Sequence, residues 1–157
     1  MLQYLKKILT PIDFSEYSVR AMDRAYELAK ETGAEFHLIH VVAPHHNYLL
    51  LPLAADAERA REMAREAGMV EQAEEELERL KKDHLENSKK VKVVSLVGHP
   101  VAKIAEYAKE QGIDLILMAT HGRTGLEHMM IGSVAEKLVR TAPCSVLVLR
   151  TERGAQS

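Results

Sequence analysis

The stretch from Leu115 to Ala119 reads LILMA, and each of its residues is apolar. A run of this kind is typical of an inner strand of a parallel sheet, because helices cover both faces of such a sheet and leave no side for polar groups. Gly112 precedes the run and a glycine-rich segment follows it, so residues that favour turns mark both ends. The stretch therefore predicts a buried parallel strand.

The segments around this strand alternate between strand and helix patterns. Four more segments are short, apolar and rich in β-branched residues, and we predict strands at Leu5 to Ile12, Phe36 to Val42, Val91 to Val97 and Ser145 to Leu149. Between them apolar residues recur three and four positions apart, which predicts helices at Ser15 to Gly33, Asp56 to Leu85, Pro100 to Gly112 and Ser133 to Arg140. The strands are too far apart for hairpins, so right-handed crossovers connect them. The predicted class is α/β, with one open, mostly parallel, five-stranded sheet and helices on both faces.

Individual residues mark where these helices begin, end and bend. Ser15 has the side chain of a helix N-cap, and Gly33 stands where a C-cap is expected. Gly68 lies inside the long helix at a cost of ~1 kcal/mol relative to Ala, so we expect a bend or a split there. From Ala43 to Leu53 the chain lacks periodicity, which predicts an irregular surface loop.

Length and composition are those of an ordinary globular domain. The 157 residues have a mass of 17.6 kDa, and we expect a single domain over residues 1–150 with a frayed tail over residues 151–157. Lys and Arg number 21 against 23 Asp and Glu, so the net charge of −2 does not favour nucleic acid. No apolar run approaches the ~18 residues of a membrane span, and we expect no membrane insertion. One cysteine, Cys144, and an opening segment unlike a signal peptide lead us to expect a cytoplasmic protein.

The motifs of several enzyme classes are missing from the sequence. It contains no G-x-x-x-x-G-K-[ST] phosphate loop, no G-x-S-x-G nucleophile turn and no H-E-x-x-H zinc motif. We therefore expect neither a strong ATPase nor a serine hydrolase nor a zinc enzyme, and at most weak ATP hydrolysis. His121 and His128 are the candidate bases for such hydrolysis. We interpret Cys144, which precedes a predicted buried strand, as a packed, unreactive thiol.

Two separate segments have the residues of a site for a phosphate group. Ligands of open parallel sheets bind beyond the carboxyl ends of the strands, and Thr10 to Asp13 and His121 to Gly125 both follow predicted strands. Gly132 and Ser133 then open a predicted helix, whose N-terminus carries a partial positive charge. Glycines let phosphate oxygens approach backbone N–H groups closely. Together these features predict an anion site.

Both features also have plainer interpretations. Gly122 and Gly125 fit a flexible loop that binds nothing. The run from Ser133 to Glu136 fits a capping box, in which the serine side chain bonds the backbone N–H three residues on and the glutamate reaches back. The two roles of the serine are compatible in alternate rotamers.

Several separated motifs closely resemble the universal stress protein family. They are TPIDFS at Thr10 to Ser15, HVV at His40 to Val42, VGHP at Val97 to Pro100, MATHGRTG at Met118 to Gly125, IGSVAE at Ile131 to Glu136 and APCSVLV at Ala142 to Val148. Their order matches the family over nearly the whole chain, and only the region from Ala43 to Asp56 lacks a counterpart. The resemblance implies a Rossmann-like sheet of the adenine nucleotide alpha hydrolase type, a homodimer and, in one subgroup, an ATP site.

The ATP-binding subgroup carries Gly, two residues, Gly, nine residues, and then Gly followed by Ser or Thr. On this chain the second and third glycines are Gly122 and Gly132, and the hydroxyl residue is Ser133. Ala119 stands in place of the first glycine, so a ribose or phosphate near that backbone would meet an extra methyl group. The resemblance implies ATP, or AMP or ADP, as the ligand, with Mg²⁺ held mainly by phosphate oxygens and water.

The resemblance also implies how the nucleoside would be bound. Asp13 would lie beside the ribose or adenine, and Pro11 would shape that wall of the site. Val41 would contact the adenine through its backbone and side chain. For Asp13 a plainer interpretation stays open, because an acid after a strand often caps its own turn.

By the same resemblance a loop and a helix start would bind the phosphates. The expected phosphate donors are Gly122, Gly132, Ser133 and Val134, and Ala119, His121, Arg123 and Gly125 are further expected nucleotide-binding residues. Backbone N–H groups and the serine hydroxyl would donate to the phosphate oxygens. Arg123 would add positive charge or would simply be an exposed loop cation, and His121 would make hydrogen bonds within the loop or act as a base.

These implications lead to one main hypothesis and two competitors. We predict a dimeric sensor or regulator in the stress response that binds an adenine nucleotide and an unidentified protein partner. The competitors are a slow ATPase or phosphotransferase, and a dimeric interaction protein with a vestigial cleft, for which Ala119 is the best evidence. The homodimer would cover the apolar edge of the last strand, formed by Val146, Leu147, Val148 and Leu149.

Overall fold

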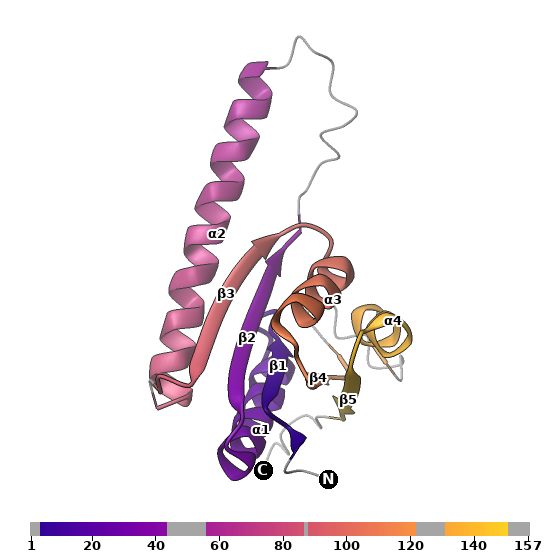
Figure 1. Cartoon of the computed structure of the whole chain (residues 1–157). Helices are drawn as coiled ribbons and strands as arrows, with labels where there is room; N and C mark the ends of the chain where they lie inside the picture. The colour runs from indigo at the N-terminus through magenta and orange to yellow at the C-terminus, as the bar shows by residue number, and fades with distance from the viewer. Residues whose placement is uncertain (1–3, 44–55, 87, 122–130, 151–157) are drawn as a thin grey trace, which may run out of the picture.

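The computed structural model describes residues 4–43, 56–86, 88–121 and 131–150. Five strands and four helices alternate along these residues (Figure 1). The strands are β1 (Lys7–Pro11), β2 (Glu35–Val42), β3 (Val91–Val97), β4 (Leu115–Ala119) and β5 (Ser145–Leu149). The helices are α1 (Glu16–Thr32), α2 (Asp56–His84), α3 (Pro100–Gln111) and α4 (Ser133–Thr141). The predicted order of elements is confirmed.

The strands form one sheet in the order β3-β2-β1-β4-β5, and every neighbouring pair is parallel. The chain builds outward from β1 to β3 on one side and then crosses back to place β4 on the other side of β1. The strand order therefore reverses between β1 and β4. In an open α/β sheet the carboxyl ends of such a pair mark the expected ligand-binding position. The predicted α/β class with an open parallel sheet is confirmed.

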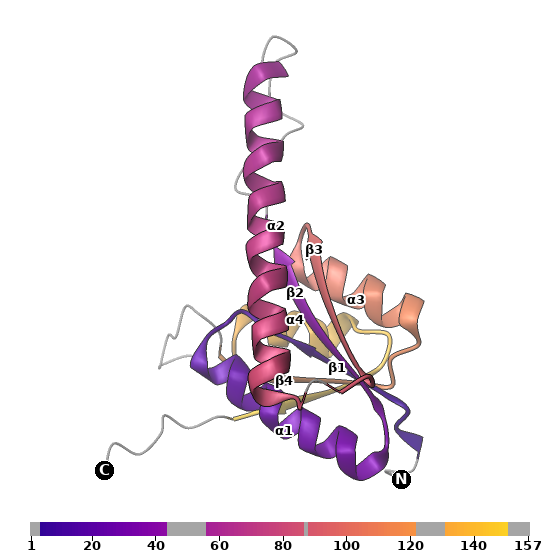
Figure 2. The same cartoon turned by 90° about the vertical axis from the view of Figure 1, so that its left-hand side faces the viewer.

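Helices cover both faces of the sheet and bury a separate core on each face (Figures 1 and 2). One core lies beneath α1 and α2, and the other lies beneath α3 and α4. In β1, Ile8 belongs to the first core and Leu9 to the second, and both are fully buried. No residue of β4 is more than 8 % exposed. The apolar LILMA stretch is thus an inner strand covered on both faces, as predicted.

Local capping residues begin and end the helices at the predicted positions. Ser15 is the N-cap of α1, and its side-chain oxygen accepts a hydrogen bond from the N–H of Ser18 at 3.2 Å. Gly33 ends the same helix with a φ of +73°, a conformation that glycine adopts without steric penalty. Pro100 is the first residue of α3, where its missing N–H costs nothing.

Helix α2 is longer than the part of the sheet against which it packs. Leu77 is fully buried in the first core, whereas Met63, nearer the end that projects past the sheet, is 63 % exposed (Figures 1 and 2). The helix runs as one continuous element of 29 residues through Gly68. The expectation of a bend or split there is wrong, because the ~1 kcal/mol cost of one glycine is small beside a hydrogen-bond ladder of this length.

Parts of the sequence analysis concern residues outside the described ranges. The irregular loop predicted from Ala43 to Leu53 lies outside them apart from its first residue, and so does the tail over residues 151–157. Among the residues that are described, none of the helices is both long and apolar enough to cross a membrane.

Candidate functional site

A hollow of about 280 Å³ opens at the carboxyl ends of the strands. Eight of the predicted ligand-binding residues border it, namely Pro11, Asp13, Val41, Ala119, His121, Gly132, Ser133 and Val134. They come from the ends of β1, β2 and β4 and from the start of α4, so segments far apart in the sequence converge here. Gly122, Arg123 and Gly125, together with His128, lie outside the described residues.

The hollow occupies the position where the strand order reverses. Pro11 ends β1 and Ala119 ends β4, and these strands are neighbours in the sheet. The chain leaves β1 for α1 on one face of the sheet, whereas α4, which follows β4, lies on the other face. This divergence is the feature that opens a ligand crevice in sheets of this type. The volume is close to the lower end of the range for small-molecule sites, about 300–1,000 Å³.

Gly132 joins the start of α4 to the end of β4. Its N–H donates a hydrogen bond to the carbonyl oxygen of Thr120 over 2.5 Å. A β-carbon on Gly132 would lie 3.0 Å from the same oxygen, which is closer than side chains ordinarily come to the backbone. The φ of Gly132 is −71°, which suits any residue, so close approach and not backbone freedom requires glycine here. This contact holds the N-terminus of α4 beside the hollow.

Helix α4 begins at the edge of the hollow. The first hydrogen bond of the helix runs from the N–H of Glu136 to the carbonyl of Gly132 at 3.0 Å. The N–H groups of Ser133, Val134 and Ala135 precede it, so the helix itself supplies no acceptor for them. These three residues all border the hollow. Together with the helix dipole they form a site suited to an anion.

The capping box that the sequence allowed is not formed. Gly132 takes the N-cap position, and Ser133 is the first residue of the helix. The carboxylate of Glu136 accepts a hydrogen bond from Arg140 at 3.1 Å, one turn further along the helix, instead of reaching back. The Ser133 side chain is therefore not used as a cap, and the residue borders the hollow.

Asp13 caps its own turn and also borders the hollow. Its Oδ1 accepts a hydrogen bond from the N–H of Ser15 at 2.9 Å, so the plainer interpretation of this acid is confirmed. The preceding residue, Ile12, donates its N–H to the carbonyl of Ile39 at 2.8 Å and ties the turn to β2. Because the same residue lines the hollow, the cap does not exclude a role toward a ligand.

Ala119 and His121 border the hollow at and just beyond the end of β4. Ala119 is 6 % exposed and packs in the core beneath α1 and α2, so little of its methyl group is available to obstruct a ligand. The Nδ1 atom of His121 shares a hydrogen bond of 2.9 Å with the Thr120 hydroxyl. The His121 ring also lies 6.1 Å, between centroids, from the ring of Tyr17 in α1. Both neighbours orient the His121 ring, whose role toward a ligand stays a prediction.

Nine further residues border the hollow, and the sequence analysis did not select them. They are Ile12, Ser18, Ile39, His40, Pro100, Ile104, Met118, Thr120 and Ala135. Most of them adjoin selected residues in the sequence, and the rule that carboxyl ends of parallel strands meet at one edge would have identified them. Ser18, Pro100 and Ile104 come from the N-terminal parts of helices α1 and α3, and no local signal marks them as ligand-binding residues.

A buried ionisable cluster lies at the other end of β2, away from the hollow. His37 is fully buried; its Nε2–H donates to Glu35 at 2.5 Å, and its Nδ1 accepts from the Tyr107 hydroxyl at 2.8 Å. Burial lowers the pKa of His37, and the Glu35 carboxylate opposes that shift. A hydrogen bond from Lys92 lowers the pKa of Glu35, and burial raises the pKa of Tyr107. This cluster joins β2, β3 and α3 and borders no part of the hollow.

Other reactive groups point to no second site. Within the described ranges, no three His, Cys, Asp or Glu side chains are grouped as ligands for a metal ion. Cys144 is partly buried as a free thiol, and burial raises its pKa, which fits the predicted unreactive role.

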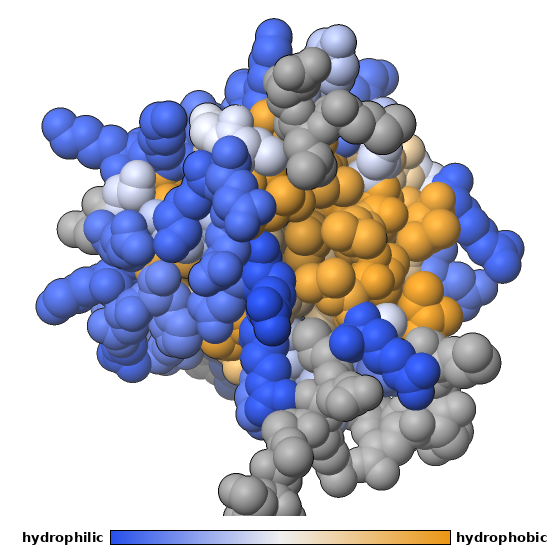
Figure 3. Space-filling view, turned by 90° about the horizontal axis from the view of Figure 1, so that it is seen from below, coloured by the Kyte–Doolittle hydropathy of each residue, from blue (hydrophilic) through white to orange (hydrophobic). Residues whose placement is uncertain are grey.

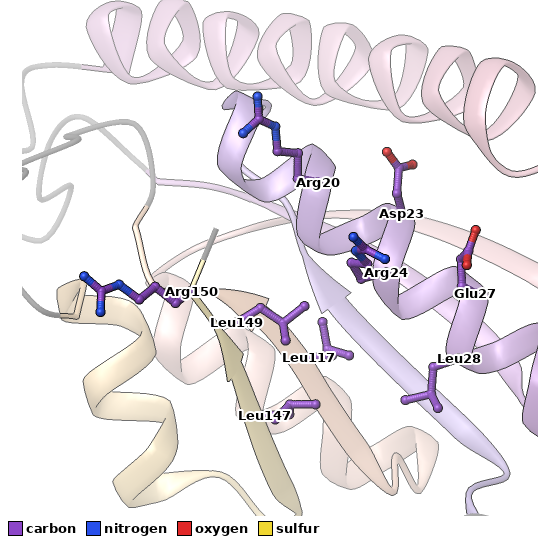
Figure 4. Close-up of a pocket in the computed structure, with 9 residues that line it drawn as sticks. All are labelled: Arg20, Asp23, Arg24, Glu27, Leu28, Leu117, Leu147, Leu149 and Arg150. Atoms are coloured by element: carbon purple, nitrogen blue, oxygen red, sulfur yellow. The ribbon is translucent and has the colours of Figure 1, made fainter. Parts of the chain in front are cut away.

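A larger hollow, of about 700 Å³, lies between α1 and β5 (Figure 4). Four leucines point into it, namely Leu28, Leu117, Leu147 and Leu149. Asp23 and Glu27 line its rim but point away from these leucines (Figure 4). Figure 3 shows a broad hydrophobic surface on the side of the molecule seen from below. Three arginines, Arg20, Arg24 and Arg150, also line the larger hollow. We assign the ligand site to the smaller hollow, because strand ends and a helix N-terminus meet there, which is the expected position for a ligand of an open parallel sheet.

The chain is similar to universal stress proteins over nearly its full length. The family model for the universal stress protein family matches residues 5–150. Universal stress protein MJ0531 of Methanocaldococcus jannaschii is 38% identical over 147 residues, which cover 92% of this chain and 82% of that protein. The solved structure of protein MJ0577 superimposes with a TM-score of 0.81 at 29% identity, covering 96% of this chain and 99% of that one. MJ0577 is a universal stress protein of the same organism.

Two more distant structures share the fold and were solved with nucleotides. A universal stress protein in complex with cAMP matches with a TM-score of 0.61 at 22% identity, covering 94% of this chain and 98% of that one. A universal stress protein from Archaeoglobus fulgidus in complex with dAMP matches with a TM-score of 0.60 at 18% identity, covering 96% of this chain and all of that one.

Proposed function

The chain belongs to the universal stress protein family, and on that premise we propose that it binds an adenine nucleotide in the hollow at the strand ends. The ligand is ATP, or AMP or ADP, and Mg²⁺ accompanies it, held mainly by phosphate oxygens and water. Residues 1–150 act as one domain. The nucleotide-bound and empty forms differ in their affinity for a protein partner, so the chain works as a cytoplasmic sensor or regulator in the stress response.

One observation carries this proposal: the N-terminus of α4 meets the end of β4 at the edge of the hollow. The N–H groups of Ser133, Val134 and Ala135 precede the first hydrogen bond of the helix, and all three residues border the hollow. Phosphate oxygens accept hydrogen bonds from such groups and interact favourably with the helix dipole. A β-carbon on Gly132 would crowd the Thr120 carbonyl and displace the start of α4, which carries these N–H groups. We call these N–H groups and the end of β4 the phosphate cradle. We therefore assign the phosphates to this end of the hollow.

Other residues that border the hollow suit a nucleoside. Val41, Met118 and Ile104 supply apolar surface for a base. The Asp13 carboxylate lies at the end of β1, where it can accept hydrogen bonds from ribose hydroxyl groups. Pro11 has no N–H and a fixed φ, so it forms a rigid part of the same wall.

The competing hypothesis of a vestigial cleft depended on the methyl group of Ala119. Since Ala119 is 6 % exposed and packs in the core, it gives that hypothesis little support. The hypothesis of a slow ATPase needs a base at the terminal phosphate. His121 borders the hollow, but its Nδ1 is engaged with Thr120, so at most weak hydrolysis is expected.

Relatives of the same fold support an adenine nucleotide as the ligand. Two universal stress proteins were solved with cAMP and with dAMP, which share the adenine base and one phosphate. At 22% and 18% identity, these two structures show only that this chain shares their fold. The assignment of ligand residues here therefore depends on the hollow itself.

The second part of the proposal is a homodimer through the edge of β5. This strand ends the sheet, and Leu147 is 42 % exposed on it. The proposed interface consists of Val146, Leu147, Val148 and Leu149. A second copy that pairs with this edge would satisfy its backbone groups and cover part of the leucines between α1 and β5. An exposed apolar edge strand is otherwise a site of aggregation.

The nucleotide content of freshly purified protein tests the main proposal. Acid release followed by chromatography with ultraviolet detection should yield an adenine nucleotide, and protein stripped of it should show a raised melting temperature with magnesium ATP. GTP at the same concentration is the control, and it should produce a smaller shift. Protein that carries no nucleotide and gains no stability from magnesium ATP would support the vestigial cleft instead.

A further inference from the structure

The turn between β1 and α1 holds a bulky residue in an unfavourable backbone conformation. Phe14 has a φ of +64°, in the left-handed region that large L-residues rarely adopt. This conformation costs roughly 1–2 kcal/mol for such a residue, so surrounding contacts must maintain it. The strained residue directly follows Asp13, the acid that borders the hollow.

One side chain from the neighbouring strand contacts this turn on both sides of Asp13. The Nδ1–H of His40 in β2 donates a hydrogen bond to the carbonyl oxygen of Ile12 at 2.7 Å. The His40 ring also packs on the Phe14 ring, with centroids 4.6 Å apart and planes tilted by 40°. His40 lies on the face of β2 opposite to His37, as the alternation of strand side chains predicts.

Further hydrogen bonds join the turn to Ile39 of β2 and to the start of α1. Oδ1 of Asp13 accepts from the N–H of Ser15 at 2.9 Å, and the N–H of Asp13 donates to the Ser18 hydroxyl at 3.4 Å. Both bonds stay within the segment that leads from the turn into α1. The link from Ile12 N–H to Ile39 fixes the end of β1 but not the residues after it. The His40 contacts tie the turn to β2 through a side chain, on both sides of Asp13.

We propose that His40 is a positioning residue for the nucleotide: it holds Ile12 and Phe14 and thereby aims Asp13 at the ribose side of the hollow. This inference rests on the proposed nucleotide site. It assigns His40 an effect on nucleoside recognition that acts through Asp13, with little effect on the phosphates, which bind at the N-terminus of α4. His40 also borders the hollow, so direct contact with the ligand is the rival explanation.

A double-mutant cycle separates the two explanations. The variants are His40→Leu, which removes both the donor and the ring, Asp13→Ala, and the two combined. Isothermal titration with magnesium ATP should show about 10-fold weaker binding for His40→Leu, equivalent to about 1.4 kcal/mol. In the Asp13→Ala background the same substitution should change the affinity by less than about 2-fold. Inorganic tripolyphosphate should bind His40→Leu about as well as it binds the wild type.

Two further variants serve as rescue and control. His40→Asn places an amide nitrogen near the position of Nδ1, so it should keep the bond to Ile12 and recover most of the ATP affinity lost in His40→Leu. Tyr26→Leu removes the ring contact with Phe36, at 5.7 Å in the same core, and should lower stability without changing ATP affinity.

The outcomes separate this inference from the proposed function. Wild-type protein that binds no adenine nucleotide would overturn the proposed function. Wild-type protein that binds ATP while His40→Leu binds it equally well would overturn the positioning role alone. A His40→Leu loss that is as large in the Asp13→Ala background as in the wild type would also overturn it, in favour of direct contact.

Discussion

The α-carbon of Gly132 lies so close to Thr120 that a β-carbon built on it would stand 3.0 Å from the Thr120 carbonyl oxygen. The same two residues are joined by a backbone hydrogen bond from Gly132 to Thr120. This pair connects the end of β4 with the first turn of α4, which are the two parts of the proposed phosphate cradle. The geometry makes position 132 the most sensitive point of the site.

Replacing Gly132 by Val should abolish nucleotide binding and leave the dimer intact. The new side chain would push against a backbone oxygen that cannot rotate away, which should also cost about 1–3 kcal/mol of stability. Titration calorimetry with magnesium ATP and the mass in solution are the measurements. The matched control is Gly68→Val, because a β-carbon there would contact nothing within 4 Å. ATP affinity retained by the Gly132 variant would mean that the phosphates bind elsewhere.

Replacing Asp13 by Ala should weaken AMP binding more than tripolyphosphate binding. A hydrogen bond to a charged group is worth about 1.5–3 kcal/mol, so we expect AMP to bind roughly 10-fold or more weakly. Asp114→Ala is the control, since Asp114 accepts from the N–H groups of Lys6 and Lys7 at the other end of β1. An equal loss for AMP and tripolyphosphate would contradict the role assigned to Asp13.

Replacing Leu147 by Asp should dissociate the proposed homodimer. A carboxylate buried in an apolar interface without a partner costs several kcal/mol, so the dimer should weaken roughly 100-fold or more. Light scattering during gel filtration should then give the mass of one chain, 17.6 kDa. Met63→Asp is the control, because Met63 is also exposed but lies on α2. A Leu147 variant that stays dimeric would place the interface on another surface.

Acid should destabilise the protein through His37 before it affects most carboxylates. Burial lowers the pKa of His37 below 6.5, so the unfolded chain takes up this proton at a higher pH than the folded chain does. The free energy of unfolding should therefore fall as the pH drops below 6.5. Urea unfolding between pH 7.5 and about pH 5 should show this loss for the wild type and a smaller one for His37→Asn. Equal losses for both proteins would show that other groups cause it.

Elements whose signals are local were predictable from the sequence. The apolar run at β4 predicted burial on both faces, and Ser15 and Gly33 predicted the two ends of α1. These signals act within a few residues of where they stand, through side-chain periodicity and capping hydrogen bonds. The parallel arrangement of the strands followed from the crossover rule, since the connections are too long for hairpins, whereas the strand order β3-β2-β1-β4-β5 came from the structure.

Features that depend on contacts between distant segments were not predictable in the same way. The capping box at Ser133 was a reasonable local interpretation, but the bond from Gly132 to Thr120 makes Gly132 the N-cap instead. The role of His40 likewise arises from a strand that lies beside the turn in space, 28 positions along the chain from Ile12. Neither contact has a signature within its own segment.

The sequence by itself determined the α/β class, the order of the elements and eight of the seventeen residues that border the hollow. These features could be predicted because the periodicity of hydrophobic residues, the turn residues and the spacing within motifs are properties of short segments. The tertiary structure alone decided which backbone N–H groups face the hollow, where the methyl group of Ala119 goes and what holds the turn at Asp13. These three features depend on how strands and helices from distant parts of the chain pack together. Such packing is set by close contacts between side chains of different segments, and no single segment encodes those contacts.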